Sequence, residues 1–339
     1  AFVKHGAWSV VSSYRPMDLW TLSDLCTPWC IHVAATLRIA DHIEAGVSDV
    51  ADLAAAAGAD RDSLYRVLRH HVGKGVFEEP ERGRFALNET ARGLLGESGR
   101  IGFDLEGIGG RMAYAWGTML SAVRTGKPAY HEAFGRGFWD DLDAHPNIAA
   151  SFDALMGVAG HGTPDPGVLV DSSDWSSIRT VVDVGGGAGA LLAEILRARP
   201  HVRGTLVDLP RPAARAVETF AAAGVADRVT VAPQSFFDPL PAGADLYILK
   251  SVLGDWPDRE ATAILRRCAE AARPAGLVVA FTKSTPGEEA SPELLMMVLV
   301  GGRDRTFEEF RELAREAGLE VTAAGRQASG RGIVECRPM

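Results

Sequence analysis

The chain has little of several features that mark special classes of protein. Only four of its 339 residues are cysteine, too few to staple a chain of this length with disulfides. No apolar run approaches the length of a membrane span, and residues 1–11 lack the apolar core of a signal peptide. We therefore expect a globular, cytoplasmic protein with Cys26 and Cys30, one helical turn apart, as buried thiols.

An excess of positive charge is also absent. The formal net charge is −9, whereas a protein that binds nucleic acid needs lysine and arginine to neutralise phosphates. We therefore expect neither nucleic acid nor a membrane as a partner. No cluster of histidines and carboxylates has the spacing of a metal centre, so no metal is expected either.

The N-terminal part of the chain contains a winged-helix pattern. Helices are predicted over 31–40, 50–57 and 63–72, followed by strands over 76–79 and 84–87 around a turn. A DNA-binding regulator is one interpretation, but the predicted wing is acidic, and Trp20–Ala40 has more apolar surface than one small domain can hide. The pattern favours a dimerisation module that packs against a second copy of the chain.

From Thr180 the chain alternates between strands and helices. This alternation is typical of a parallel sheet covered by helices on both faces. The last two predicted strands straddle a turn and close the sheet with an antiparallel hairpin, which dinucleotide-binding domains mostly lack. The strands are predicted over 180–184, 204–209, 229–231, 244–249, 276–281, 319–324 and 332–336.

A glycine-rich loop follows the first of these strands. Its spacing, with Asp183, Gly185, Gly187 and Gly189, fits both a dinucleotide-binding loop and the loop of S-adenosylmethionine (SAM) methyltransferases. Asp183 favours SAM, because an anion at this point would repel a pyrophosphate, whereas SAM has no phosphate and a cationic methionine end.

Three further stretches at successive strand ends suit an adenosyl ligand. Asp208 can accept hydrogen bonds from ribose hydroxyls, Ser235 and Phe236 can meet the adenine, and Lys250 can reach a methionine carboxylate. Taken singly, these residues could instead be a helix cap, a core aromatic and a solvated charge. Their occurrence together favours a ligand site.

These stretches resemble the SAM-dependent small-molecule O-methyltransferases of the plant phenolic type, and especially the actinomycete enzymes that tailor aromatic antibiotics. The motifs are the glycine loop, Val207–Pro210, Phe236–Pro239, Leu249–Asp258 and Gly301–Thr306. The resemblance implies an α/β fold with a Rossmann-like class I methyltransferase domain over 171–339. It also implies an N-terminal helical, winged-helix dimerisation domain over 1–99, a helical linker over 100–170 that walls the substrate pocket, and a homodimer.

The resemblance also assigns residues to the two ligands. A small aromatic substrate is expected against Trp116, Met112, Phe152, Met297 and Asp304. With the two loop residues Asp183 and Gly187, the residues expected at SAM are Met156, Gly160, Gly185, Asp208, Leu209, Ser235, Phe236, Lys250 and Trp256.

The chain departs from the family pattern where a general base is expected. The usual catalytic histidine is Gly254, and two family glutamates are replaced by Thr282 and Asp304. Asp255 remains, but a carboxyl group with an ordinary pKa of about 3.9 is a weak base for a phenol of pKa about 10. The histidines His131 and His161 lie in segments that could face the pocket, and each could equally be a surface residue.

The lead hypothesis is therefore SAM-dependent methylation of an aromatic antibiotic intermediate, at oxygen, by positioning rather than by a strong base. Methylation of carbon or nitrogen stays open, as does other chemistry by a SAM-bound enzyme, such as hydroxylation, decarboxylation or a pericyclic step.

Overall fold

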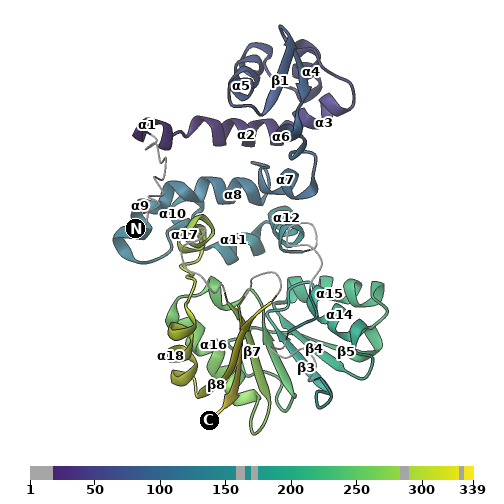
Figure 1. Cartoon of the computed structure of the whole chain (residues 1–339), viewed down its shortest axis with the longest axis vertical. Helices are drawn as coiled ribbons and strands as arrows, with labels where there is room; N and C mark the ends of the chain where they lie inside the picture. The colour runs from purple at the N-terminus through teal and green to yellow at the C-terminus, as the bar shows by residue number, and fades with distance from the viewer. Residues whose placement is uncertain (1–17, 158–164, 169–174, 283–289, 328–331) are drawn as a thin grey trace, which may run out of the picture. The chain divides into compact units, whose positions relative to one another are not determined.

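The chain divides into two units, one on either side of residue 95. The computed structural model describes residues 18–157, 165–168, 175–282, 290–327 and 332–339, and its two units are residues 1–95 and 96–339. Figure 1 labels their helices and strands. None of the described helices is both long and apolar enough to cross a bilayer.

The first unit confirms the winged-helix prediction. Helices α4 (Val50–Ala57) and α5 (Arg61–Gly73) are each capped by an aspartate, Asp49 and Asp60 respectively. Each aspartate side chain accepts a hydrogen bond from a backbone N–H in the first turn of its helix. The apolar faces of the two helices pack with the wing around Leu53, Leu68 and Phe77. The elements are α1 (Leu19–Leu22), α2 (Cys26–Thr36), α3 (Ile39–Glu44), α4 (Val50–Ala57), α5 (Arg61–Gly73), β1 (Phe77–Glu81), β2 (Arg84–Leu87) and α6 (Glu89–Arg92).

Two expectations for this unit are wrong. A helix was expected to run through residues 31–40, but the chain breaks between α2 and α3, where Arg38 adopts a left-handed conformation with φ 56°. Cys26 is exposed and Cys30 is half-buried, so they are not core thiols. The physical reason is that α2 buries Ala34 and Ala35 at its far end, while its first turn lies at the surface.

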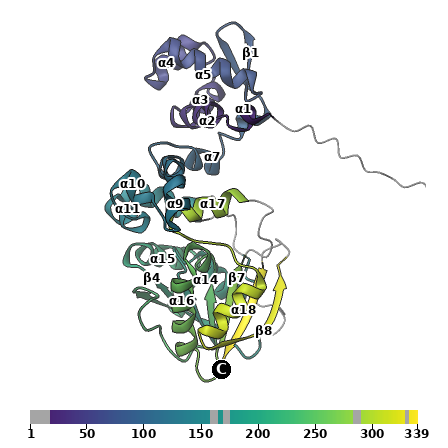
Figure 2. The same ribbon diagram turned by 90° about the vertical axis from the view of Figure 1, so that its left-hand side faces the viewer.

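The second unit begins with a helical layer. Its core is apolar and includes Ile108, Tyr130 and Leu142, together with Val298 and Leu299 from much later in the chain. Figure 2 shows the later helix, α17 (Ala290–Leu299), beside α9. The other helices are α7 (Glu97–Gly102), α8 (Ile108–Ala115), η1 (Trp116–Thr118), α9 (Met119–Thr125), α10 (Tyr130–Phe134), α11 (Phe138–Ala144) and α12 (Pro146–Met156).

A seven-stranded sheet forms the rest of this unit. The strand order is β5-β4-β3-β6-β7-β9-β8, with the first five strands parallel and the closing hairpin antiparallel, as the sequence predicted. The strands are β3 (Thr180–Val184), β4 (Arg203–Asp208), β5 (Val229–Pro233), β6 (Leu246–Leu249), β7 (Leu277–Thr282), β8 (Leu319–Arg326) and β9 (Gly332–Pro338).

Helices cover both faces of the sheet. Val182 and Leu249 pack on one face with α16 (Asp258–Ala271) and α18 (Phe307–Glu316), and Val181 and Ile248 pack on the other with α14 (Ala190–Ala198) and α15 (Pro210–Ala222). In Figure 1 these two pairs of helices lie on opposite sides of the strands. Short 3₁₀ turns, η2 (Ala226–Arg228) and η3 (Leu253–Asp255), complete the described elements. The predicted α/β fold is confirmed.

Candidate active site

The glycine loop lies between β3 and α14, at the carboxyl edge of the sheet. The Gly187 N–H donates a hydrogen bond to Asp208 Oδ2 at 2.7 Å, and Gly187 has a left-handed φ of 60°. A Cβ atom at Gly187 would meet none of the described atoms within 4 Å. Glycine is therefore favoured there by its backbone conformation, and the open space is available to a ligand.

Asp208 ends β4 and faces this loop. Its second oxygen, Oδ1, accepts a hydrogen bond from the Leu209 N–H at 2.7 Å. Burial raises the pKa of Asp208, while the two backbone N–H groups act in the opposite direction. Each carboxylate oxygen has two lone pairs, so both can still accept a ligand hydroxyl.

Asp183 is the buried acid of the site. It is 1% exposed, and its Oδ2 atom has no hydrogen-bond partner among the described residues. Burial raises its pKa to about 7, with the Lys250 charge opposing that rise and Asp208 adding to it. A buried acceptor without a partner indicates a place for a ligand that brings a donor or a positive charge.

An aromatic cluster stands beside the loop. The rings of Trp139 and Trp256 stack with centroids 6.4 Å apart, and Phe236 meets Trp256 edge-on at 5.9 Å. Phe152 meets Trp139 edge-on from α12. A Cβ at Gly185 would lie 3.4 Å from the Phe236 ring, so this ring packs directly on the glycine loop. Trp139 was not singled out by the sequence analysis, because only the fold brings α11 to η3.

Helix α12 is held to α15 by an ion-pair cluster. Asp153 Oδ2 accepts hydrogen bonds from Arg211 Nη1 at 2.5 Å and from Arg215 Nη1 at 2.9 Å. These pairs connect the end of α12, where Met156 is 40% exposed, to the start of α15, where Leu209 is 39% exposed. Two of the residues expected at SAM therefore lie on helices that are tied together.

The turn that contains Gly254 and Asp255 is anchored by Arg305. This side chain is buried, and it donates to Leu253 O and Trp256 O at 2.7 Å each and to Asp258 Oδ1 at 2.9 Å. Sequence analysis missed this role, since Arg305 reaches the turn from 49 or more residues away along the chain.

The place of the missing histidine has room for a side chain. A Cβ at Gly254 would have one neighbour within 4 Å among the described atoms, Asp304 Oδ1 at 3.9 Å. Gly302 is different, because its Cβ would lie 2.1 Å from Gly254 O. The backbone of the 300–306 segment therefore presses against the η3 turn, and only glycine fits at the contact.

The remaining predicted residues are spread over the helical layer and the strand ends. Met112, Phe152 and Met297 pack in one apolar cluster, and Trp116 is 37% exposed on η1. His131 is exposed on α10, while Ser235 Oγ accepts a hydrogen bond from Phe237 N at 3.2 Å. Gly160 and His161 lie outside the described residues.

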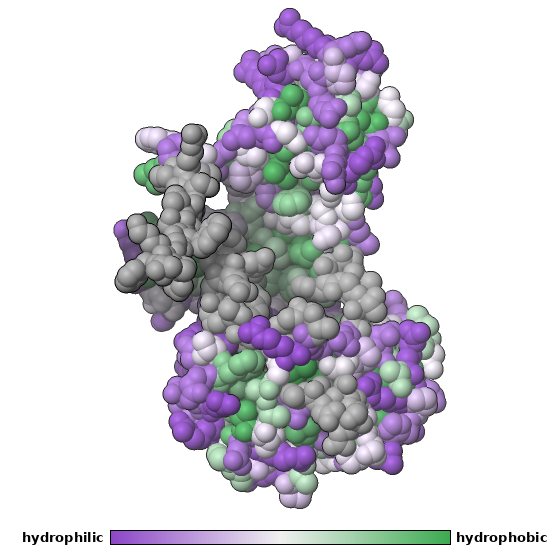
Figure 3. Space-filling model, viewed as in Figure 1, coloured by the Kyte–Doolittle hydropathy of each residue, from purple (hydrophilic) through white to green (hydrophobic). Residues whose placement is uncertain are grey.

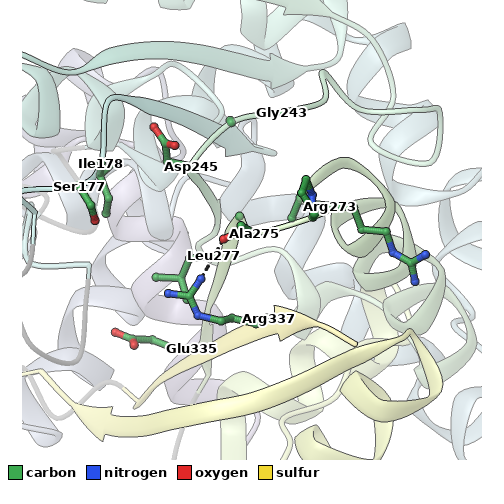
Figure 4. A pocket seen from close by; sticks show the side chains of 13 residues that line it. Ser177, Ile178, Gly243, Asp245, Arg273, Ala275, Leu277, Glu335 and Arg337 are labelled. Carbon is green, nitrogen blue, oxygen red and sulfur yellow. Dashed lines mark hydrogen bonds between the residues drawn. The ribbon is translucent and has the colours of Figure 1, made fainter.

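A polar hollow of about 350 Å³ lies elsewhere on this unit. Figure 4 shows its lining, in which Arg337 Nη1 donates a hydrogen bond to Ala275 O at 2.8 Å. Asp245 and Leu277 place it at the amino ends of β6 and β7. Ligands of parallel α/β sheets bind at the carboxyl ends, so this hollow is not the site of the glycine loop.

Known families match both units. The O-methyltransferase domain matches residues 116–320, and the O-methyltransferase dimerisation domain matches residues 20–97. The chain belongs to the O-methyltransferase family. SAM is its cofactor, and the fold is the Rossmann-like methyltransferase domain with an N-terminal dimerisation domain.

Individual relatives of this O-methyltransferase cover almost its whole length. The 2,7-dihydroxy-5-methyl-1-naphthoate 7-O-methyltransferase of Streptomyces carzinostaticus is 43% identical over 313 residues, 91% of this chain and 94% of the relative. The aclacinomycin 10-hydroxylase of Streptomyces purpurascens is 42% identical over 327 residues, 92% of this chain and 86% of the relative.

A solved structure shows the same fold. It is the crystal structure of an O-methyltransferase from neocarzinostatin biosynthesis in complex with SAM and 2-hydroxy-5-methyl naphthoic acid. The TM-score is 0.89 and the identity 42%, covering 95% of this chain and 99% of the other. The residues of the present O-methyltransferase fit SAM. The acceptor oxygens of Asp208 suit its ribose hydroxyls, and Asp183 Oδ2, which has no hydrogen-bond partner among the described residues, suits its cationic end. The described atoms also leave space at Gly187.

Proposed function

We propose that this O-methyltransferase transfers a methyl group to an oxygen atom of a small aromatic intermediate in antibiotic biosynthesis. The observation that carries the proposal is the aromatic cluster beside the glycine loop, in which Phe236 and Trp256 belong to the cofactor side. Trp139 stacks on Trp256 and Phe152 meets Trp139 edge-on, so these two rings offer flat apolar surfaces that suit an aromatic substrate. The named activities of the relatives, on a naphthoate and on an aclacinomycin, support this substrate class.

The proposal gives each polar residue at the sheet edge a role in binding. SAM, when bound, supplies a methyl group on a sulfonium, which is already a strong electrophile. Asp208 accepts the ribose hydroxyls, Lys250 pairs with the carboxylate of the methionine end, and Asp183 accepts a donor from the amino group of that end. Met156, Leu209, Ser235 and Trp256 complete the walls of the cofactor site.

The substrate proton does not need a strong base in this proposal. Alignment of two reactants lowers the activation barrier by about 7–11 kcal/mol. General-base catalysis raises the rate by about 10²–10⁴-fold, which is a smaller effect. With Gly254 in the usual histidine position, the suitable substrate is a phenol already acidified by a neighbouring carbonyl. Asp255, the carboxylate next to Gly254 in the chain, can receive the proton. His131 and His161 are the other candidate proton acceptors.

The proposal extends to the assembly. The segment 100–170 walls the substrate pocket, with Trp116, Met112, Met297 and Asp304 near the substrate, and the chain acts as a homodimer through its N-terminal domain. The match of residues 20–97 to a dimerisation domain supports the homodimer. The cytoplasmic location stays a prediction.

A second candidate is a reaction in which SAM is bound but not consumed. The similarity to a hydroxylase over 92% of this chain favours it, and so does the absence of histidine at position 254. The two candidates share the site and differ only in what happens to the methyl group.

Turnover with trideuteromethyl-SAM separates these candidates. The enzyme is offered a panel of phenols, hydroxyquinones and hydroxynaphthoates, and mass spectrometry follows the labelled product and S-adenosylhomocysteine. We expect both to form in equal amounts, with the label on oxygen. Label on carbon or nitrogen, or conversion of a substrate with SAM intact, would contradict the first proposal, and the latter result would support the second.

A further inference from the structure

Two thiols and an imidazole meet in the first unit, far along the chain from the glycine loop. Cys26 and Cys30 occupy successive turns of α2, and His70 lies in the last turn of α5, which packs against α2. One ligand atom from each residue lies within 4.8 Å of the others. Methyl transfer, as proposed above, uses none of the three residues.

The distance between the sulfur atoms suits a shared metal ion. Cys26 Sγ and Cys30 Sγ are 3.8 Å apart. Two thiolates at about 2.3 Å from one zinc ion, with a tetrahedral angle between them, stand about 3.8 Å apart. The sulfur atoms of a disulfide are only about 2.05 Å apart, so these side chains would have to move to form one.

Neighbouring polar groups support the imidazole. His70 Nε2 lies 2.8 Å from Thr27 Oγ1, and Thr27 Oγ1 donates to Asp24 Oδ2 at 2.6 Å. Metal-binding imidazoles are usually oriented by hydrogen-bonded groups of this kind. Asp24 also pairs with Lys74 at 2.8 Å, which ties the start of α2 to the end of α5.

The cluster consists of ligands that favour zinc. Cys26 is exposed, and Cys30 and His70 are half-buried. Thiolate and imidazole select zinc and related borderline ions over magnesium or calcium.

We propose that Cys26, Cys30 and His70 bind one zinc-class metal ion in the first unit. Within the described part of the chain no fourth group belongs to the cluster, so solvent takes the remaining position. The ion would fasten the first turn of α2 to the last turn of α5. The sequence analysis expected no metal, because it found no cluster of histidines and carboxylates. It did not connect Cys26 and Cys30 with His70, which lies 40 or more positions away.

Cobalt and zinc titrations of the full-length, reduced enzyme test this site. Co²⁺ bound by thiolates gives an intense charge-transfer absorption, which Zn²⁺ should abolish by displacement. We expect one ion per chain and a higher melting temperature with Zn²⁺. Cys26→Ser, Cys30→Ser and His70→Gln should each weaken binding at least about tenfold. His42→Gln, which changes a histidine of α3 outside the cluster, should bind as the wild type does.

Circular dichroism establishes that each variant is folded before its affinity is compared. The proposal is wrong if the folded Cys26→Ser/Cys30→Ser double variant binds Co²⁺ as tightly as the wild type. It is also wrong if bound Co²⁺ lacks the thiolate charge-transfer band. Neither result depends on whether the enzyme transfers methyl groups.

Discussion

At the scale of single residues, Asp183 couples stability to pH. Its pKa of about 7 in the folded protein lies above the ordinary value of 3.8, so the folded state binds more protons between these two values. The free energy of unfolding of the cofactor-free protein should therefore fall as pH rises from about 4 to about 7. The rise in the pKa of Asp183 corresponds to a loss of about 4 kcal/mol in the free energy of unfolding across this pH range.

The substitution Asp183→Asn should remove that dependence. We expect the cofactor-free variant to be more stable than the wild type at pH 8 and to bind SAM more weakly, because the amide cannot provide the charge. Chemical denaturation at several pH values and calorimetric titration with SAM measure the two effects. The substitution could weaken SAM binding and yet leave the pH dependence of stability unchanged. Burial of the Asp183 charge would then not be the cause of that pH dependence.

Asp245→Asn is the matched control. Burial raises the pKa of Asp245, but hydrogen bonds from Arg179 and Thr180 outweigh this effect and lower the pKa overall. Its contribution to stability is thus present at neutral pH and lost as pH falls toward and below the ordinary value of 3.8. This variant should be less stable than the wild type at pH 8, the opposite of Asp183→Asn.

Gly254→His tests whether a base limits the reaction. A Cβ atom at Gly254 would meet only Asp304 Oδ1 among the described atoms, at 3.9 Å, so we expect the variant to fold. If positioning carries methyl transfer, kcat should change by less than about tenfold. A general base typically contributes about 10²–10⁴-fold, so a rise of that size would show that the native enzyme is limited by proton removal.

At the scale of elements, the η3 turn depends on Arg305. Replacing it with lysine leaves the carbonyl groups of Leu253 and Trp256 without their present donors. We expect Arg305→Lys to lower stability by about 1–3 kcal/mol and to reduce kcat/KM more than it reduces SAM affinity. Differential denaturation and steady-state kinetics provide the measurements.

Arg303→Lys is the control, because Arg303 also pairs with Asp258 but is 41% exposed. Exposed ion pairs contribute about 0–1 kcal/mol. Equal losses of stability in the two variants would mean that the ion pair with Asp258 stabilises the fold. The hydrogen bonds from Arg305 to the η3 carbonyl groups would then contribute little to stability.

The elements also show what a sequence can predict. Strands β3, β6 and β7 were predicted because they are short apolar runs bounded by turns. The glycine loop was predicted because its backbone conformation requires glycine, so the loop can be recognised from its composition. The break at Arg38 and the stacking of Trp139 on Trp256 were not predicted. A left-handed arginine has no compositional signal, and the stacking depends on contacts between segments more than 100 residues apart.

At the scale of the whole molecule, the first unit exposes apolar side chains that suggest association. Trp20 is 86% exposed, Leu19 77%, Leu25 74% and Leu22 60%, all within one short segment. Figure 3 shows apolar side chains gathered between hydrophilic ones on the face of this unit that it presents. Soluble monomers rarely leave such segments uncovered, and this segment overlaps the dimerisation domain.

We therefore expect the wild-type enzyme to be a dimer at micromolar concentration. The double variant Trp20→Asp/Leu25→Asp should dissociate into monomers. Loss of one central aromatic contact costs about 2 kcal/mol or more, which is about thirtyfold in the dissociation constant. Val217→Asp, at an apolar residue of α15 that is 55% exposed in the other unit, should remain dimeric. Sedimentation over a concentration series measures all three proteins. A monomeric wild type would contradict the homodimer, and a dimeric double variant would place the interface away from this segment.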